Sequence, residues 1–223
     1  MGWLIAFLCV ALIDWVAAGK QWHRVRVITK PISLILLIIW FSTKGGWVQT
    51  GIWFGSGLIF SLIGDLFLLL RPRFFLFGLT AFLIAHLCYI TGFLQGKLQF
   101  SYLIILPILV VVMLGVLVYP KIIRSLRRKL ENRRLTIPVT IYMFTITSML
   151  FLALMTWFRP TWGFWGAIGA SFGALLFTIS DSVLAIGKFS RPFQYSNFLI
   201  MFTYHLGQLG ITFGILAKLG LIS

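Results

Sequence analysis

The stretch LIFSLIGDLFLLL, from Leu58 to Leu70, carries a single charged residue, Asp65, in an otherwise apolar run. The whole chain of 223 residues has only four acidic residues. A charged side chain costs about 2.5–3.5 kcal/mol at the centre of a membrane helix, and such residues usually face the bundle interior or a watery cavity. An aspartate in this position therefore indicates either a functional group or a polar contact that links two helices.

The residues around this stretch have the composition of an integral membrane protein. Hydrophobic residues make up 60% of the chain and charged residues 10%, which is outside the range of soluble domains. A helix needs about 17–25 apolar residues to cross the hydrocarbon core. The sequence contains eight candidate segments, of which the second is short: 2–18, 31–43, 51–70, 74–95, 101–120, 138–157, 162–187 and 195–216. We therefore expect an all-α polytopic bundle of eight transmembrane helices.

The first of these segments has no basic residue before it, because the first Lys or Arg of the chain is Lys20. A secretory signal usually begins with a positively charged region ahead of its apolar core. We therefore expect residues 1–18 to be a retained helix and not a cleaved signal.

The basic residues alternate between the two ends of the expected helices. The net charge is +15, and 15 of the 19 Lys and Arg residues fall in the connections after the first, third, fifth and seventh helices. By the positive-inside rule these connections are cytoplasmic and both termini are outside. We expect a multi-pass membrane protein, in the plasma membrane if the source is bacterial. The basic residues have this explanation and do not indicate nucleic-acid binding.

The densest basic segment, residues 121–137, divides the chain into two halves. We interpret residues 1–223 as one membrane domain, with halves of about 1–120 and 138–223 joined by this segment as a cytoplasmic loop. Several basic residues beside a membrane are attracted to acidic lipids, so we expect the loop to lie along the anionic leaflet surface.

A short pattern occurs in both halves. FSLIGDLFLLL around Asp65 resembles LFTISDSVLAI around Asp181, and each is followed by a basic turn that contains proline. The next helix in each half carries a histidine, which is His86 in the first half and His205 in the second. Four-helix repeats of this kind would be parallel, related by an axis along the membrane normal. Chance similarity between two apolar helices is the alternative.

Three of the four acidic residues, Asp14, Asp65 and Asp181, lie inside expected helices. Each precedes the first basic residue of the following connection by six or seven positions, so all three would lie roughly 9–11 Å inside the cytoplasmic boundary. Lys30 enters from the same side and could pair with one of them. These aspartates could be buried groups that neighbouring helices satisfy, but two of them in matching contexts at one depth favour a functional site.

Other polar side chains follow helix faces that we expect to point inward. His86 and Tyr89 are three residues apart in the fourth expected helix. Tyr204, His205 and Gln208 belong to a polar stripe along one face of the eighth. A polar face is unfavourable against lipid, so these side chains are candidates for the interior of the bundle.

The histidines and aspartates are of types that could bind zinc. The chain has no HxxxH or HExxH pair, however, which would fix two ligands on one turn of a helix. We therefore expect no metal ion at this site. Cys9 and Cys88 lie far apart in the sequence and form no CxxC motif.

Several segments together resemble the YhhN family of membrane proteins, which includes the lysoplasmalogenases. The resemblance is carried by TKPISL at 29–34, GDLFLLL at 64–70, FLFGLTAFLIAHLCYITGF at 75–93, GALLFTISDSVLAIGKF at 173–189 and FTYHLGQ at 202–208. It covers most of the chain, from about Lys30 to Gln208. One departure is His205, where a second tyrosine after Tyr204 is more usual in the family.

The resemblance implies about eight membrane helices and hydrolysis of the vinyl ether bond of lysoplasmalogens. The products would be a fatty aldehyde and glycerophosphocholine or glycerophosphoethanolamine. The expected partners are therefore a lysophospholipid substrate and the lipid bilayer. The sequence does not indicate the headgroup preference or the oligomeric state.

This chemistry agrees with a pair of intramembrane carboxyl groups. An acid must protonate the alkene carbon, and a second carboxylate can stabilise the resulting cation or deprotonate the attacking water. The hypothesis is that Asp65 and Asp181 form this catalytic pair without a metal or an organic cofactor, and which of them is the acid stays open. The candidate substrate-binding or orienting residues are Lys30, His86, Tyr89, Tyr204, Gln208 and Asp14. Arg71 or Lys188 could attract the lipid phosphate.

Two other classes of protein would also use such residues. A small ion-coupled transporter has intramembrane carboxylates and repeats, but its site usually lies near the midplane. The aspartates here are expected toward one leaflet, where the headgroup linkage of a lysolipid lies, which favours the lipid hydrolase. A non-catalytic lipid-binding protein would bind the same substrate without turnover.

Overall fold

The computed structural model describes residues 2–70, 72–97, 101–128, 130–190 and 193–222. Within these residues the chain forms eight long α-helices, each long and apolar enough to cross a membrane. They are α1 (Gly2–Gly19), α2 (His23–Thr43), α3 (Gly51–Leu69), α4 (Phe75–Leu94), α5 (Ile105–Arg128), α6 (Thr136–Leu154), α7 (Gly163–Phe189) and α8 (Ser196–Lys218). The structure confirms the predicted all-α fold, and the protein is an integral multi-pass membrane protein.

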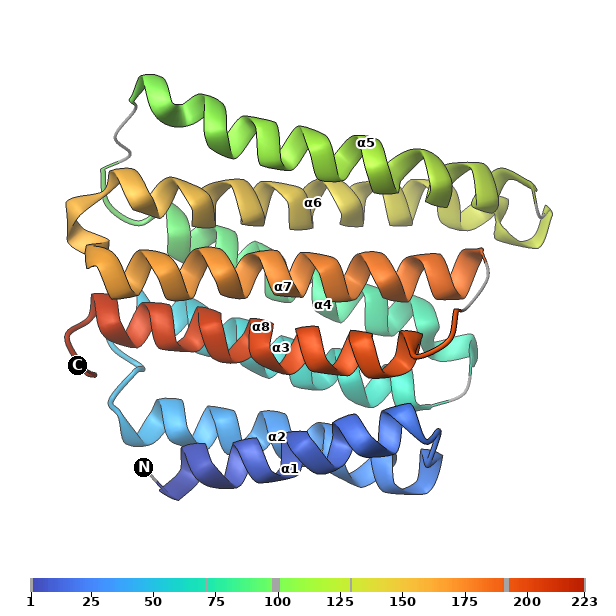
Figure 1. Ribbon diagram of the computed structural model, residues 1–223, viewed down its shortest axis with the longest axis horizontal. Coiled ribbons are helices and arrows are strands. Elements are labelled where there is room, and N and C mark those ends of the chain that lie inside the picture. The colour runs from blue at the N-terminus through green and yellow to red at the C-terminus, as the bar shows by residue number, and fades with distance from the viewer. Residues whose placement is uncertain (1, 71, 98–100, 129, 191–192, 223) are drawn as a thin grey trace.

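The helices run back and forth, so successive connections alternate between the two ends of the bundle (Figure 1). Both termini lie at one end, together with the connections α2–α3, α4–α5 and α6–α7. The connections rich in Lys and Arg lie at the opposite end, which we call the basic end. The positive-inside rule predicts that the basic end is cytoplasmic.

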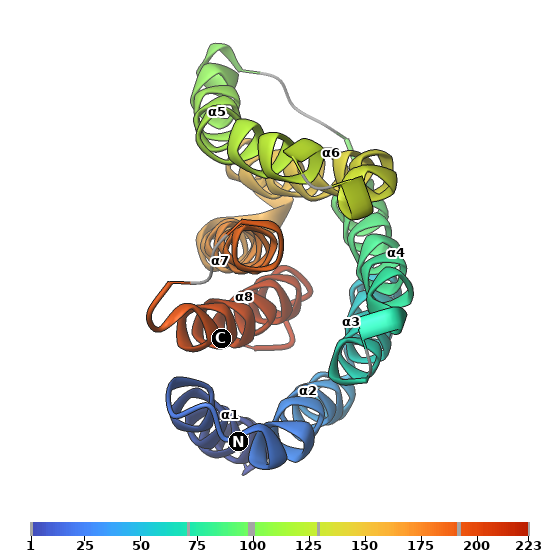
Figure 2. The same ribbon diagram turned by 90° about the vertical axis from the view of Figure 1, so that its right-hand side faces the viewer.

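Viewed from the end, the bundle has an inner pair and an outer arc (Figure 2). Helices α1, α2, α3, α4 and α6 follow one another around α7 and α8, while α5 packs outside against α6 and α7. Of the membrane-spanning residues of α7 and α8, 56% and 67% are buried, against 6% for α5. The inner pair can therefore carry polar side chains away from lipid.

Small residues bring the two inner helices close together. A Cβ atom on Gly173 of α7 would overlap the backbone nitrogen of Ile211, and one on Gly207 of α8 would lie 2.8 Å from the nitrogen of Phe177. Membrane helices associate mainly through such close packing, because lipid is as apolar as their side chains. The α7–α8 contact therefore sets the position of every polar group on these two helices.

Gly173→Ala is expected to lower the melting temperature of the detergent-solubilised protein by several degrees, because overpacking of this kind costs about 1–3 kcal/mol. Gly187→Ala on the same helix is the matched control, since a Cβ there meets no atom within 4 Å. Thermal unfolding followed by circular dichroism compares the two variants. Equal melting temperatures would contradict the close approach at Gly173.

Two helix boundaries differ by eight residues from those predicted, and each of these differences involves a proline. Helix α2 begins at His23 and continues through Pro31, which is the start that the sequence predicts. Helix α5 continues past Pro120 to Arg128, so the first part of the expected loop is helical. Prolines are tolerated in membrane helices because neighbouring groups satisfy the freed backbone atoms.

The extension of α5 has an apolar face that the basic residues conceal in the sequence. Ile122 and Leu126 lie one turn apart on α5 and are fully buried against Val139 and Phe189. The Ser125 hydroxyl donates a hydrogen bond to the carbonyl of Phe189. This packing makes a helix more stable than a loop in residues 121–128.

Candidate functional site

A cavity of about 370 Å³ lies near the basic end, between α2, α3, α4, α7 and α8. Asp65 of α3 and Asp181 of α7 both line it. The structure therefore brings together the two aspartates of the matching sequence patterns. The basic side chains on its wall are His23, Arg26, Lys30 and Lys188.

Asp65 is held between two donors. The ammonium of Lys30 lies 2.7 Å from Oδ1, and the hydroxyl of Tyr204 donates to Oδ2 over 2.7 Å. Asp65 is fully buried, and the Lys30 nitrogen lies 5.6 Å from the centre of the Tyr204 ring. Because an ammonium has no lone pair to offer, this arrangement requires Asp65 to be an acceptor, and it stabilises an ionised carboxylate.

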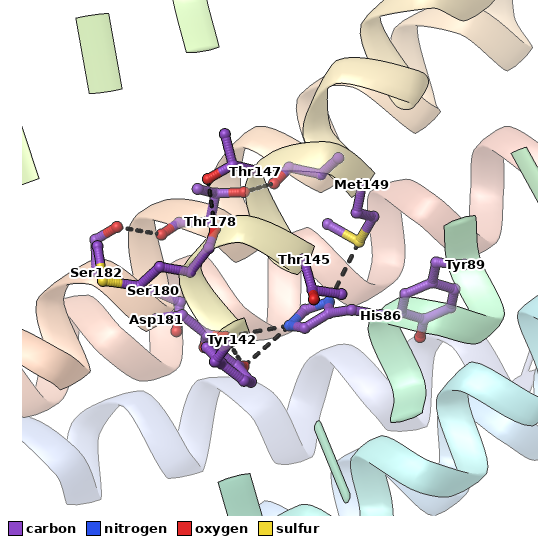
Figure 3. A network of polar contacts seen from close by, with 12 residues as sticks. His86, Tyr89, Tyr142, Thr145, Thr147, Met149, Thr178, Ser180, Asp181 and Ser182 are labelled. Atoms are coloured by element: carbon purple, nitrogen blue, oxygen red, sulfur yellow. Dashed lines mark hydrogen bonds and ion pairs between the residues drawn. The ribbon is translucent and has the colours of Figure 1, made fainter. Parts of the chain in front are cut away.

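Asp181 belongs to a second network, whose members point toward one another from α4, α6 and α7 (Figure 3). The Tyr142 hydroxyl donates to Asp181 Oδ2 and lies 2.9 Å from His86 Nε2. His86 Nε2 is 3.4 Å from the same carboxylate oxygen, and its Nδ1 is 3.3 Å from the sulfur of Met149. His86 is fully buried, whereas the Asp181 side chain keeps 12% of its surface exposed in the cavity.

The two networks are formed crosswise between the halves of the chain. Asp65 of α3 contacts Tyr204 of α8, and Asp181 of α7 contacts His86 of α4. Each acid is therefore bound by the last helix of the other half. Two parallel repeats facing one another would give this arrangement, although the repeat itself stays a prediction.

Other predicted residues lie behind the cavity wall. Tyr89 donates to Gln208 Oε1 over 2.7 Å, and both side chains are fully buried. Asp14 accepts a hydrogen bond of 2.6 Å from Thr29, which links α1 to α2. These contacts connect neighbouring helices. Tyr89, Gln208 and Asp14 are not among the described residues that line the cavity. Arg71 lies outside the described residues.

His205 is engaged elsewhere in the bundle. Its Nδ1 accepts a hydrogen bond of 3.0 Å from the indole nitrogen of Trp15, and its ring is fully buried. The histidine of the second half is therefore a link between α8 and α1. His86, the histidine at the corresponding position of the first half, contacts an aspartate. The two histidines therefore have different surroundings, although they occupy matching positions in the proposed repeat.

The sequence gives no prediction for several residues of the site, among them Tyr142 and Arg26. Tyr142 is a neutral residue in the apolar helix α6, with no distinguishing neighbours. Arg26 lines the cavity from α2, but it precedes Pro31 in a segment that we expected to be a loop. These residues can be identified as part of the site only once the positions of α2 and α6 in the bundle are known.

The cavity offers a cationic surface beside two carboxyl groups. Arg26 and Lys188 lie on its wall, and the ammonium of Lys30 is already paired with Asp65. Cationic side chains at a cavity mouth suit a phosphate group. Among the described residues, no three His, Cys, Asp or Glu side chains converge as ligands for one metal ion.

Comparison with known proteins confirms the resemblance seen in the sequence. The model of the YhhN family matches residues 25–215. Lysoplasmalogenase TMEM86B of Homo sapiens is 29% identical over 94% of this chain and 84% of that protein. Lysoplasmalogenase TMEM86A of Homo sapiens is 32% identical over 90% of this chain and 82% of that protein.

A bacterial relative shows the same extent of similarity. The uncharacterized membrane protein YhhN of Escherichia coli O157:H7 is 30% identical over 92% of this chain and 95% of that protein. No solved structure matches the chain. From the family match and these relatives, the chain belongs to the YhhN family.

Proposed function

We propose that the protein is a lysoplasmalogenase-like membrane hydrolase that cleaves the vinyl ether bond of lysoplasmalogens. Relatives that match nearly the whole chain are named lysoplasmalogenases. The observation that carries the proposal is that Asp65 and Asp181 line one cavity with different hydrogen-bond partners. Two carboxyl groups in different environments can divide acid and electrostatic roles between them.

The reaction adds one water molecule across the vinyl ether. A proton is transferred to the alkene carbon that does not bear oxygen, which gives an oxocarbenium ion. Water then attacks the carbon that bears oxygen and loses a proton, giving a hemiacetal. The hemiacetal breaks its bond to the glycerol oxygen and yields the fatty aldehyde and the glycerophospho-alcohol. The protein must supply one proton and stabilise one positive charge.

Asp65 is suited to stabilise the charge. Both of its carboxylate oxygens already face a donor, one from Lys30 and one from Tyr204. An ionised carboxylate in a site that excludes most water attracts a developing cation strongly. Asp65 therefore stabilises the oxocarbenium ion, while Lys30 and Tyr204 hold the Asp65 carboxylate in its orientation.

Asp181 is suited to donate the proton. The Tyr142 hydroxyl lies within hydrogen-bond distance of both Asp181 and His86, but it has only one proton to donate. If Tyr142 donates to Asp181, His86 Nε2 must donate to Tyr142. If one proton then moves from His86 to Tyr142 and another from Tyr142 to Asp181, His86 becomes neutral and Asp181 is protonated. The three residues therefore form a relay that loads Asp181 with a proton.

Met149 supports this relay by orienting His86. A thioether sulfur is only an acceptor, so His86 Nδ1, 3.3 Å away, is the nitrogen that keeps its hydrogen. The other ring nitrogen, Nε2, is then the one that gains or loses a proton toward Tyr142. After the proton has passed to the substrate, the water that attacks the cation returns one to Asp181.

Tyr142→Phe is expected to lower kcat about ten- to hundredfold with little change in KM, because general-acid assistance contributes about 10²–10⁴ and the variant removes only the hydroxyl that bonds and positions Asp181. Tyr119→Phe is the matched control. Its hydroxyl lies on the exposed surface of the neighbouring helix, 3.4 Å from Thr140. Steady-state kinetics of both variants would show an unchanged kcat for Tyr142→Phe if the relay is wrong.

The basic end of the cavity is suited to the headgroup. Arg26 and Lys188 lie on its wall, so a lysolipid from the leaflet at the basic end can place its phosphate beside them. Its vinyl ether, next to the glycerol, then lies deeper, at the level of Asp65 and Asp181. In this proposed pose the reactive bond lies within reach of both carboxyl groups.

The test is release of long-chain aldehyde from lysoplasmenylcholine and lysoplasmenylethanolamine by the purified, detergent-solubilised protein, with and without a chelator. The proposal predicts aldehyde from at least one substrate at a rate that the chelator does not change. Absence of aldehyde from both substrates would contradict the proposed function, and loss of activity with the chelator would contradict the carboxylate mechanism.

A further inference from the structure

A second hollow adjoins the candidate site on its membrane side. It is narrow, about 70 Å³, and lies between α4, α5, α6 and α7. It shares Leu68, Phe75, Phe82, Asp181, Leu184 and Lys188 with the site cavity. We call it the side groove. Because these residues line both hollows, the side groove and the site cavity lie side by side at Asp181.

The wall of the side groove is apolar in effect, although it includes four hydroxyl residues, of which Tyr142 donates to Asp181. Thr147, Thr178 and Ser182 donate to carbonyls of their own helices, over 2.6, 2.8 and 2.7 Å. Their hydrogens are therefore already used. The rest of the wall consists mainly of aliphatic and aromatic side chains, so the side groove suits a hydrocarbon and not a polar ligand.

The side groove extends from the level of Asp181 toward the middle of the bilayer. Ser125 of α5 lies level with Phe189 at the end of α7, because its hydroxyl donates to the Phe189 carbonyl. Asp181 is eight residues and Gly115 ten residues before this level, so at 1.5 Å per residue they lie roughly 12 and 15 Å from it. A lipid chain in the leaflet at the basic end runs in the same direction.

There is unfilled space beside α5 at the deeper end of the side groove. A Cβ atom on Gly115 would meet no atom within 4 Å. Because Gly115 has no side chain, the side groove stays open beside α5 and a hydrocarbon chain can lie there. At its basic end, the side groove is bounded by the fully buried Ile122 and nearly fully buried Phe189.

We infer that the side groove binds the single hydrocarbon chain of the lysolipid, with the chain running from Asp181 toward Gly115. The inference rests on the proposed function for the identity of the substrate. With the phosphate near Arg26 and the vinyl ether at the carboxyl groups, the first methylene groups of the chain must leave the cavity. The side groove shares the Asp181 wall with the cavity and continues in the direction of the bilayer interior.

The side groove selects by shape. Surrounding lipid is as apolar as the wall, so a chain gains little free energy by entering it. A narrow groove admits one chain beside Asp181. The lipids that fit are therefore single-chain lipids, and a second acyl chain on the glycerol would have to occupy the polar cavity.

The first test fills the open space. Gly115→Phe is expected to lower kcat/KM about tenfold for an 18-carbon alkenyl chain, because one pocket substitution of this size discriminates by at least that factor. Turnover of a short 4-carbon alkenyl chain, which stays beside Asp181, is expected to stay within about twofold on the same basis. Val116→Phe, at a position that is 67% exposed, is the matched control.

The second test needs no turnover. A lysophosphatidylcholine with a photoactivatable diazirine at the end of its acyl chain is cross-linked to the wild-type protein and to both variants. We expect cross-links near Gly115 on α5 and Ile146 on α6, with loss of these in Gly115→Phe only. Cross-links spread evenly over the lipid-facing surface would overturn the inference, as would an unchanged chain-length profile in an active Gly115→Phe variant.

The two tests separate this inference from the proposed function. If the wild-type protein releases no aldehyde from any chain length, the proposed hydrolysis fails. The cross-linking pattern still decides whether a single lipid chain occupies the side groove, because the acyl probe has no vinyl ether.

Discussion

Replacing Asp181 with asparagine is expected to lower turnover of a lysoplasmenylcholine about a thousandfold, because loss of a general acid typically costs 10²–10⁴ in rate. Asparagine has nearly the shape of aspartate and can still accept the hydrogen bond from Tyr142. It has no acidic proton to give to the alkene carbon. Aldehyde release by the purified variant, measured together with its melting temperature, tests this result.

Asp14→Asn is the matched control for Asp181→Asn. Asp14 is also an aspartate of a membrane-spanning helix, but it is fully buried and its contact is the hydroxyl of Thr29 behind the cavity. An amide oxygen can accept the same hydrogen bond. We expect this variant to keep most of the wild-type rate. Full activity in Asp181→Asn would remove that residue from the mechanism.

Replacing Asp65 with asparagine is expected to lower turnover about a hundred- to a thousandfold, since the loss of one preorganised electrostatic partner costs this much in other enzymes. The variant also leaves the ammonium of Lys30 in a buried site without its carboxylate. Removing one partner of a buried pair destabilises a protein by about 3–5 kcal/mol. Loss of activity alone would therefore not separate the two effects.

A charge-matched double variant separates them. Lys30→Met combined with Asp65→Asn removes both charges, so no uncompensated ion stays buried. We expect it to unfold closer to the wild-type temperature than Asp65→Asn does, yet to stay inactive. Recovery of activity in the double variant would show that Asp65 serves only to balance Lys30.

Hydropathy and charge in the sequence are enough to predict the helix count and that both termini lie at one end of the bundle. Both signals are physical requirements of the bilayer, because an apolar helix must span it and basic connections accumulate on one side. The positions of Asp65 and Asp181 could be predicted for the same reason. A buried charge in lipid is costly, so it indicates an interior site.

The partners of these aspartates could be predicted only in part. Lys30 and Tyr204 are recognisable as polar residues at the right depth or on the right helix face, and both contact Asp65. Tyr142 gives no such signal, because one tyrosine in an apolar helix is common at membrane interfaces. Its role depends on how α6 packs against α4 and α7, which no local pattern determines.

The helix boundaries near Pro31 and Pro120 show a second limit. Basic residues next to a proline are a pattern that predicts a loop when each segment is considered by itself. Ile122 and Leu126 recur at helical spacing among the basic residues, and burial against Phe189 and Val139 favours the helix. The decisive term is tertiary packing, which outweighs the local cost of proline.

The most direct test of the central claim is the origin of the proton that reaches the substrate. The purified wild-type protein and Asp181→Asn are each given a lysoplasmenylcholine in D₂O, and the aldehyde is analysed by mass spectrometry. The account predicts that the wild-type aldehyde carries one deuterium on the carbon next to the carbonyl and that Asp181→Asn releases almost none. Wild-type aldehyde without deuterium, or equal release by Asp181→Asn, would contradict proton transfer from Asp181.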